Sequence, residues 1–534
     1  MNRRKFLRNT VPATVVLPGL INGFSFSALG ASPGDSMSSL LASASNDHIL
    51  VLIQLNGGND GINMVVPLDM YANYYNARTN VAIPQSKVLR LDGVDKSGLH
   101  PAMTDFQNLY NDGKASLVQS VGYANQDFSH FRSTDIWMTG DITRSRFSRE
   151  KTGWLGRYLE NEYPGYPDAY PNSETPHPLA IQIADMPSVT VQGPILSMGL
   201  SIKDPEDVYT FSNPFSDYPL TATAANKELR YLRVISEKTK TYSDIIRAAY
   251  NQGSNLGTYQ DNDLAQQLRI VARLIKGGLK TRVYTVSVSG FDTHKKQVNP
   301  SDTTTGRHAS LMSELSSSMA SFQKDLELLK EDHRVLGMTF SEFGRRIQSN
   351  ASLGTDHGAA APLIMFGKHV NKGVLGKSPD IPADIKKVNN IPFQYDFRSV
   401  YATVLERWFC VKEPLIDTLL LKHYQSLPLI KGGPCGLPDT IEENNAEAEK
   451  MILKMSPVPY GISATIQFST AGGFTSVQQI NALGQVVKVI TAQDYAAGTY
   501  NLDVYDDKLL AGVYFLRLQN KSLQKVITIL KGIQ

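Results

Sequence analysis

The sequence is poor in cysteine, with only Cys410 and Cys435 among 534 residues. So few cysteines exclude a small disulfide-stapled scaffold and any zinc module built on cysteine clusters. The two are enough for one bridge in an exported protein. The sequence alone leaves open whether they pair.

The net charge is small, and long apolar runs are rare. The formal net charge is +3, and no block of Lys and Arg occurs beyond the N-terminus, which argues against nucleic acid as a partner. Beyond the N-terminal segment no apolar run reaches the length of a permanent membrane span. The composition, 42% hydrophobic and 19% charged in 534 residues, is typical of a globular protein with more than one domain.

The N-terminus has the pattern of an export signal. Arg3, Arg4 and Lys5 precede a short apolar stretch, residues 11–29, and small residues follow it up to Ala31. A basic start, an apolar middle and a small-residue exit predict a signal peptide over residues 1–31. The order Arg-Arg-x-Phe-Leu resembles the twin-arginine signal, which implies export of the folded chain by the twin-arginine machinery. An uncleaved N-terminal anchor is the alternative.

The first clear strand, residues 49–55, ends in the turn NGGNDG, which carries Asp60. In open α/β sheets ligands bind at the carboxyl ends of strands, and glycines let the chain turn tightly around this carboxylate. Asp60 is therefore a candidate metal ligand. An ordinary Asx turn after a buried strand is the alternative.

A second polar segment, DFSHFRSTDIWMTG, follows the apolar run 115–121 and opens a predicted helix. The first side chains of a helix lie at its positive end. Ser129, with His130 and Arg132 beside it, is therefore a candidate nucleophile or anion cradle. A capping serine is the alternative.

The alternating strand 282–289 ends in GFDTH, which carries Asp292 and His294. An Asp and a His two residues apart on a loop can both reach one zinc-like ion. A solvated loop histidine is the alternative for His294.

Two later motifs repeat this setting. The strand 335–340 ends in SEFGRR, with Glu342 and Arg345, and the motif GTDHG, with His357, leads into the strand 363–366. Carboxyl ends of parallel strands meet at one edge of a sheet. We therefore expect the side chains of all these motifs to converge in one pocket.

Helices are expected between these strands at residues 103–112, 227–250, 263–278 and 308–332. The alternation of strands and helices predicts an α/β domain over residues 45–432, with a mostly parallel sheet flanked by helices. Residues 160–220, rich in Pro, Tyr, Asn and Ser, are predicted to be a loop-rich excursion that shapes substrate access.

The character of the chain changes after residue 432. A polar, acidic stretch over residues 433–458 is typical of a linker. Short alternating strands are expected at residues 464–468, 476–480, 485–490, 498–504, 512–518 and 524–529. Short strands separated by turn residues predict a small all-β sandwich over residues 459–534.

Five motifs in order resemble a family of twin-arginine-exported bacterial proteins of unknown function: LNGGNDGINMVVP, SHFRSTDIWMTG with TGWLGR, GFDTH, TFSEFGRR and GTDHGAAAPLIMFG. That family is described as sulfatase-like and placed in the alkaline-phosphatase superfamily. The resemblance covers residues 45–432 and implies an alkaline-phosphatase-like fold. It also implies a divalent metal cofactor, zinc first, with calcium or magnesium as alternatives.

The resemblance implies a set of metal ligands. Asp292, His294 and His357 correspond to the ligands of one ion. Asp60 and Glu342 correspond to the ligands of a second ion, nearest the nucleophile. One or two ions are therefore expected.

The resemblance also implies catalytic groups. Ser129 corresponds to the nucleophile, with His130 as the alternative at that position. Arg132 and Arg345 would stabilise charge on the transferring group. The sequence departs from the superfamily at Phe343, which stands where a second histidine is expected.

The C-terminal segments NALGQ and LAGVYFLRL, with the Lys-rich end 521–531, resemble the sorting domain of the type IX secretion system. This implies passage through the periplasm and then release at the cell surface or into the medium, with the type IX machinery as a partner. A carbohydrate-binding or spacer sandwich is the alternative.

Two functions from different classes follow. The first is an exported, metal-dependent hydrolase of phosphate or sulfate esters, acting on a small or polymeric anionic ester. The second is a non-catalytic surface protein that uses the same fold to bind an anionic or polysaccharide ligand. Phe343 in place of a histidine favours the second function. The set Asp292, His294 and His357 favours the first.

Overall fold

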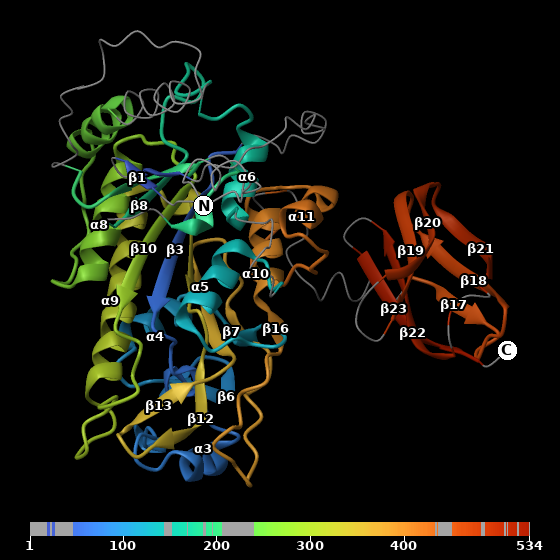
Figure 1. The fold of residues 1–534 in the computed structure, drawn as a ribbon, viewed down its shortest axis with the longest axis horizontal. Helices are drawn as coiled ribbons and strands as arrows, with labels where there is room; N and C mark the ends of the chain where they lie inside the picture. Colours follow the sequence, from blue (N-terminus) through green and yellow to red (C-terminus); the bar gives the residue numbers. More distant parts are fainter. Residues whose placement is uncertain are drawn as a thin grey trace, which may run out of the picture. The chain divides into compact units, whose positions relative to one another are not determined.

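The computed structural model describes residues 46–143, 152–205, 240–432, 435 and 451–532, with gaps at 168, 185–187, 195, 482–485, 507–508, 510 and 521–522. It also describes two short strands, β1 (Gly19–Ile21) and β2 (Phe24–Phe26), which pair antiparallel. The rest of the predicted signal peptide, residues 1–31, lies outside the described residues. Among those described, no helix combines the length and apolarity that a membrane crossing requires. The chain divides into two compact units, Met1–Ile430 and Lys431–Gln534 (Figure 1).

A nine-stranded sheet forms the centre of the larger unit, in the order β15-β7-β14-β11-β3-β10-β8-β9, with β16 beside β7. Its strands are β3 (Ile49–Asn56), β7 (Ala115–Gly122), β8 (Ala180–Ile183), β9 (Gly199–Ile202), β10 (Val283–Ser289), β11 (Val335–Phe340), β14 (Ala361–Phe366), β15 (Gly373–Leu375) and β16 (Tyr395–Asp396). β3 pairs in parallel with β10 and β11, whereas β14 is antiparallel to both of its neighbours, β11 and β7. The predicted mostly parallel sheet is confirmed.

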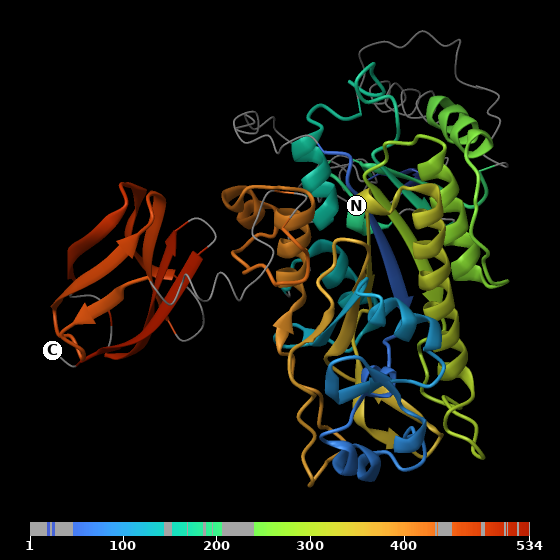
Figure 2. The same cartoon turned by 180° about the vertical axis from the view of Figure 1, so that it is seen from behind.

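Alternate residues of β3 enter two separate cores. The odd-numbered residues from Ile49 to Leu55 pack with α4 (Thr104–Asn111), α8 (Asp263–Lys276) and α9 (Arg307–Leu329). Leu50 and Leu52 pack on the other face with α5 (His130–Thr139), α6 (Trp154–Glu162), α10 (Phe397–Thr403) and α11 (Glu413–Leu419). Figures 1 and 2 show helices on both sides of β3. A strand that is covered on both faces needs a continuous apolar run, which is what β3 has.

Smaller elements complete this unit. A three-stranded sheet consists of β4 (Val65–Pro67), β5 (Leu89–Leu91) and β6 (Val94–Leu99), and a hairpin consists of β12 (Arg345–Asn350) and β13 (Gly354–His357). The short helical elements are α2 (Gly61–Met64), α3 (Tyr71–Ala77), single turns at Gln85–Lys87, Val189–Val191 and Asp332–Arg334, and a π-helical turn at Val404–Trp408.

The loop-rich interpretation of residues 160–220 is wrong in part. β8 and β9 come from this stretch, and they pair in parallel at one side of the central sheet. Residues 206–239 lie outside the described residues, and they include about half of the helix predicted at 227–250. Residues 240–252 are helical.

The smaller unit contains two antiparallel sheets that share one core. One sheet has β17 (Leu453–Ser456), β18 (Ser463–Thr470) and β21 (Gly498–Tyr505), and the other has β19 (Gly473–Asn481), β20 (Val486–Tyr495), β22 (Gly512–Asn520) and β23 (Leu523–Lys531). Side chains from both sheets, Ile466 and Leu516 among them, form that core. The predicted all-β fold is confirmed, but β17 lies inside the stretch predicted as a linker. Both cysteines of the chain are disulfide-bonded.

Candidate metal centre

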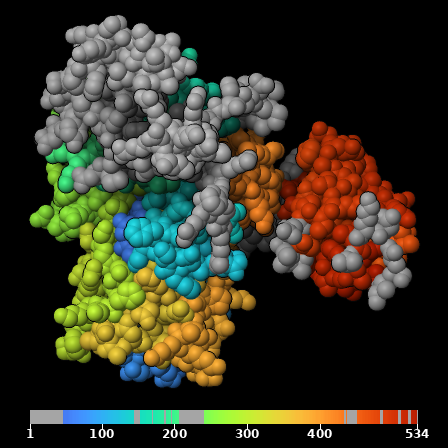
Figure 3. Space-filling model, in the orientation of Figure 1, coloured from blue at the N-terminus to red at the C-terminus, as the bar shows by residue number. Residues whose placement is uncertain are grey.

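The chemistry-bearing segments meet at one edge of the central sheet. Because β3, β7, β10 and β11 run in the same direction, their carboxyl ends lie at the same edge, and the antiparallel β14 begins there. His130 starts α5 after β7, Asp292 and His294 follow β10, Glu342 follows β11, and His357 ends β13 just before β14. Figure 3 shows the surface of the segments around α5 and of the β12–β13 hairpin next to each other. A hydrogen bond between His357 and the carbonyl of Phe128 joins the two segments.

Three histidines converge on one oxygen of Asp292. Its Oδ1 lies 3.3 Å from Nε2 of His294, 3.4 Å from Nε2 of His357 and 3.7 Å from Nε2 of His130. Donor atoms of His130, Asp292 and His357 all lie within 4.8 Å of one another. About half of the Asp292 side chain is exposed, at 48%, so that solvent and small solutes reach the cluster.

The other ring nitrogen of each histidine is already engaged. Three acceptors hold the Nδ1 atoms: Glu342 at 2.8 Å from His130, Asp356 at 3.1 Å from His294, and the backbone carbonyl of Phe128 at 2.8 Å from His357. A carboxylate or a carbonyl only accepts, so in the tautomer that donates from Nδ1 to these acceptors each Nε2 has the lone pair that a cation needs. This is the arrangement of metal-binding histidines, whose second nitrogen is held by an outer partner.

The direction of the pKa shift of His357 favours a neutral ring. Burial lowers the pKa of His357, the Phe128 carbonyl opposes this, and the nearby charge of Arg345 lowers the pKa further. The neutral imidazole is the form that binds metal. His130, His357 and Asp292 then offer three ligand atoms close enough together to hold one cation, and His294 lies at the same oxygen of Asp292.

Arg345 fixes the position of Asp292. Its guanidinium is buried and donates to the carbonyls of Gly57, Gly58, Phe291 and Thr355 and, at 2.7 Å, to Oδ1 of Asp292. Burial alone would raise the pKa of Asp292, but the hydrogen bond and charge of Arg345, with smaller contributions from His294 and His357, hold that pKa below its ordinary value. Asp292 is therefore a carboxylate, as a metal ligand must be.

Glycine is required at two positions beneath the cluster. Gly57 has a φ of 121°, and a Cβ there would lie 2.2 Å from the backbone nitrogen of Asp292. A Cβ on Gly58 would lie 2.3 Å from the ring of Phe343. That ring packs against His130 and His357, with centroids 4.9 and 4.5 Å away. The glycines thus allow the turn after β3 to approach the loop of Asp292.

The family described as "Protein of unknown function (DUF1501)" matches residues 218–419. A search among curated proteins found no match.

Several solved structures are similar to the chain at low scores. A protein in the alkaline phosphatase superfamily from Vibrio parahaemolyticus has a TM-score of 0.31 at 10% identity, and the match covers 89% of this chain and 85% of that one. A phosphonate monoester hydrolase from Silicibacter pomeroyi has a TM-score of 0.28 at 7% identity, with 90% and 88% covered. A Bacteroides thetaiotaomicron structure, titled for the metabolism of multiple glycosaminoglycans, has a TM-score of 0.31 at 7% identity. The match covers 83% of this chain and 89% of that one. Scores this low assign no role to any residue, so the site rests on its own geometry.

The structure places Asp60 away from the role predicted for it. Its carboxylate is 1% exposed and accepts from Arg78 with both oxygens at 2.8 Å and from Gln297 at 2.5 Å. Glu342 is likewise engaged, since its Oε1 accepts from His130 and from the backbone N–H of Gly57, each at 2.8 Å. Neither carboxylate is arranged as a ligand of a second ion.

The two arginines predicted to stabilise a transferring group are also engaged elsewhere. Arg132 bonds Asp135 of its own helix and the carbonyl of Thr143, and the donors of Arg345 are directed at protein carbonyls and Asp292. Ser129 is exposed at the start of α5, where its side chain makes no capping bond. It remains a candidate nucleophile.

Sequence reasoning missed two participants. His130 was predicted only as an alternative nucleophile, but its ring lies in the cluster. Asp356 was not predicted as a site residue, although it stands beside His357 in GTDHG and holds His294. An acidic residue next to a suspected ligand was the available signal for Asp356. The sequence pointed to His130 beside Ser129 but did not indicate a metal-binding role, because Glu342 reaches it from a distant segment.

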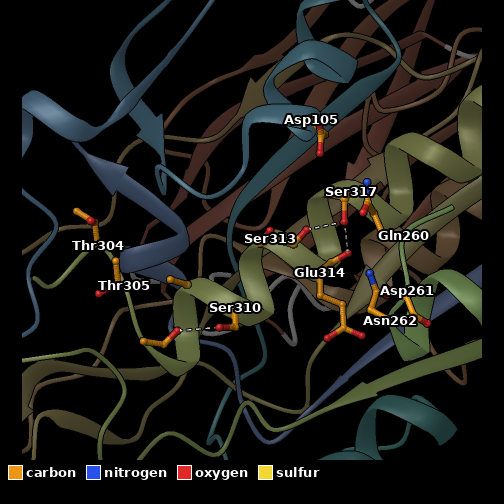
Figure 4. Close-up of a pocket in the computed structure, with 12 residues that line it drawn as sticks. Asp105, Gln260, Asp261, Asn262, Thr304, Thr305, Ser310, Ser313, Glu314 and Ser317 are labelled. Carbon is orange, nitrogen blue, oxygen red and sulfur yellow. Dashed lines mark hydrogen bonds between the residues drawn. The ribbon is translucent and has the colours of Figure 1, made fainter. Parts of the chain in front are cut away.

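A separate polar hollow of about 800 Å³ lies along α9. Figure 4 shows Ser313, Glu314 and Ser317 of α9 beside Asp261 and Asn262. Glu314 accepts from the backbone N–H of Leu264 at 3.2 Å. Among the residues that line this hollow, none has a buried polar atom without a partner, so nothing in it indicates a ligand.

Proposed function

We propose that this protein is an exported, metal-dependent hydrolase of phosphate or sulfate esters. In this proposal the ion is held by His130, His357 and Asp292, with His294 at the same carboxylate oxygen. The observation that carries the proposal is the set of three imidazoles whose Nδ1 atoms are held and whose Nε2 atoms approach Oδ1 of Asp292.

The donor set favours zinc or a similar transition metal. Imidazole nitrogens suit Zn²⁺ and its neighbours, whereas Ca²⁺ and Mg²⁺ prefer oxygen ligands. Ligands about 2.0–2.1 Å from a tetrahedral ion lie about 3.3 Å from one another. The separations of 3.3, 3.4 and 3.7 Å between the Nε2 atoms and Asp292 are close to that value. When bound, such an ion lowers the pKa of a water or hydroxyl and polarises the ester oxygen.

The residues around the cluster have side chains and backbone groups that suit the cleavage of an anionic ester. Ser129 is exposed and directly precedes His130, and in this proposal it is the nucleophile. The first backbone N–H groups of α5 stabilise negative charge at the helix start. Lys295 and Lys296, both exposed, follow His294 and favour an anionic substrate.

The proposal is for one ion. Asp60 is paired with Arg78, Glu342 holds His130, and Phe343 supplies no ligand atom. Asp60 and Glu342, which the sequence suggested as ligands of a second ion, therefore serve to position the ligands of the first ion.

A non-catalytic binding protein is the second candidate. The observation that favours it is the engagement of Arg132 and Arg345, which leaves the anion to the helix start and the exposed lysines. In this alternative the metal and the lysines retain an anionic or polysaccharide ligand without cleaving it.

A hydrolysis assay separates the two. Purified protein loaded with Zn²⁺ is expected to hydrolyse an aryl phosphate or an aryl sulfate, to lose that activity on chelation, and to regain it when Zn²⁺ is restored. A metal-loaded protein that cleaves neither ester but retains sulfated oligosaccharides would support the binding protein instead.

Export is the other part of the proposal. It is supported by the twin-arginine pattern of residues 1–31 and by the two disulfide-bonded cysteines, since disulfides persist in oxidising compartments. Replacing Arg3 and Arg4 with lysine is expected to keep the precursor in the cytoplasm, because paired guanidinium groups are not equivalent to ammonium groups. Cell fractionation is the measurement. An unchanged extracellular yield would refute twin-arginine export.

A further inference from the structure

A buried glutamine lies behind the two loops that carry the candidate ligands. Gln297 is 0% exposed, and both ends of its amide are used. Its Nε2 donates to Oδ2 of Asp60 at 2.5 Å, and its Oε1 accepts from Thr293 at 3.0 Å and from Thr355 at 2.8 Å. The chain at Gln297 is also fixed through its backbone, which bonds Leu353 and His308.

The two threonines connect Gln297 to the site. Thr293 stands between Asp292 and His294, and Thr355 directly precedes Asp356 and His357. Both threonines are 0% exposed, and the backbone N–H of Thr355 donates to the carbonyl of Thr293 at 3.1 Å. A single carbonyl oxygen of Gln297 therefore ties together the two segments that supply three of the clustered side chains.

The orientation of the Gln297 amide is set from the other side. An ionised carboxylate only accepts hydrogen bonds, so Asp60 forces the NH₂ group of Gln297 toward itself and the carbonyl toward the threonines. Arg78 holds Asp60 in turn, and it also donates to the carbonyls of Ile347 and Arg346. Fully satisfied buried networks of this kind fix one geometry.

From this network we propose that Gln297 is a positioning residue for the metal centre. It sets the spacing between the Asp292–His294 loop and the end of β13, and Asp60 with Arg78 fixes its amide. The proposal rests on the proposed function, since it needs an ion at the cluster. In this proposal the buried Asp60 is not a metal ligand but helps to fix the geometry of the site.

The test uses the purified full-length chain and Co²⁺ as the probe, followed by visible absorption and calorimetry. The variant Gln297→Leu is expected to raise the Kd for Co²⁺ about tenfold or more, as loss of outer partners of metal ligands does, and to change the Co²⁺ spectrum. Gln323→Leu is the matched control, because Gln323 is also buried but donates to Glu327 of its own helix. It is expected to bind Co²⁺ like the wild type.

Two further variants separate positioning from stability. Gln297→Glu places a carboxylate against Asp60 and is expected to weaken Co²⁺ binding, whereas Asp60→Asn combined with Gln297→Glu moves the charge across the same hydrogen bond and is expected to restore part of the affinity. If Gln297→Leu does not fold, Thr293→Val and Thr355→Val remove one hydroxyl each and are expected to weaken binding in the same direction.

The outcomes distinguish this inference from the proposed function. Wild type that binds no Co²⁺ overturns both. Wild type that binds Co²⁺, with Gln297→Leu or the threonine variants less stable but unchanged in Kd and spectrum, overturns the positioning role alone.

Discussion

Replacing His357 with alanine is expected to weaken divalent metal binding by more than about 100-fold, because loss of an outer partner already costs about 10–100-fold and His357 supplies a ligand atom. Its Nδ1 is held by Phe128 at 2.8 Å, and its Nε2 lies 3.4 Å from Asp292. Alanine removes the proposed ligand atom together with the ring contacts to His130, His294 and Phe343. Co²⁺ titration of the purified variant measures the loss.

The matched control is His423→Ala. His423 also lies beside a carboxylate, with Nδ1 3.0 Å from Asp417, but it is not among the clustered side chains at the edge of the sheet. Its replacement is expected to leave the Kd unchanged. If His357→Ala and His423→Ala bind Co²⁺ equally well, His357 is not a ligand.

Replacing Arg78 with methionine is expected to lower the free energy of unfolding of the larger unit by about 3–5 kcal/mol, the usual cost of removing one partner of a buried ion pair. Arg78 and Asp60 have fully buried side chains, so the carboxylate would be left without a counter-charge. Denaturant unfolding followed by tryptophan fluorescence measures the effect. All three tryptophans, Trp137, Trp154 and Trp408, belong to the larger unit.

The effect of Arg78→Met depends on pH in a defined direction. Burial alone would raise the pKa of Asp60, but the charge of Arg78, the charge of His308 and the hydrogen bonds from Arg78 and Gln297 together hold that pKa below its ordinary value. In wild type the Asp60 contribution is therefore complete above the unfolded pKa of about 3.9 and is lost as pH falls through the lower folded pKa. Without Arg78, burial raises the folded pKa, and the ionised form is the unfavourable one.

The stability deficit of Arg78→Met is therefore expected to be largest near pH 7 and to narrow as the pH falls toward about 4. Adding Asp60→Asn to Arg78→Met removes the unpaired charge and is expected to recover part of the loss. A deficit that stays constant with pH, or that Asp60→Asn deepens, would contradict the assignment of a buried ion pair.

Strand ends were predictable from the sequence, and they located the candidate site. The runs that became β3, β10 and β11 are apolar and end in polar, glycine-containing turns. Parallel strands bring such ends together. That reasoning was sufficient to bring Asp292, His294 and His357 to one place.

The partners of the charged residues were not predictable in the same way. Asp60 was taken for a ligand because nothing in its own turn shows that Arg78 reaches it from the end of α3. Arg345 was taken for an anion-binding group, but its donors meet backbone carbonyls of tight turns. Carbonyls exist at every residue, so a sequence pattern cannot show which of them an arginine will bind.

Short strands were the weakest part of the fold prediction. β8, β9 and β17 have only four residues each, too few to show alternation clearly. β17 is followed by Pro457 and Pro459, which favour a loop interpretation. Pairing in the sheets, rather than local preference, holds these segments extended.

Metal content tests the central claim most directly. The purified full-length chain, incubated with Zn²⁺ and then freed of unbound metal, is analysed for its elements. The arrangement of His130, His294 and His357 around Oδ1 of Asp292 predicts about one zinc ion per chain. A chain that retains no zinc would contradict the metal centre, and one that retains two would contradict the assignment of Asp60 and Glu342 as positioning groups.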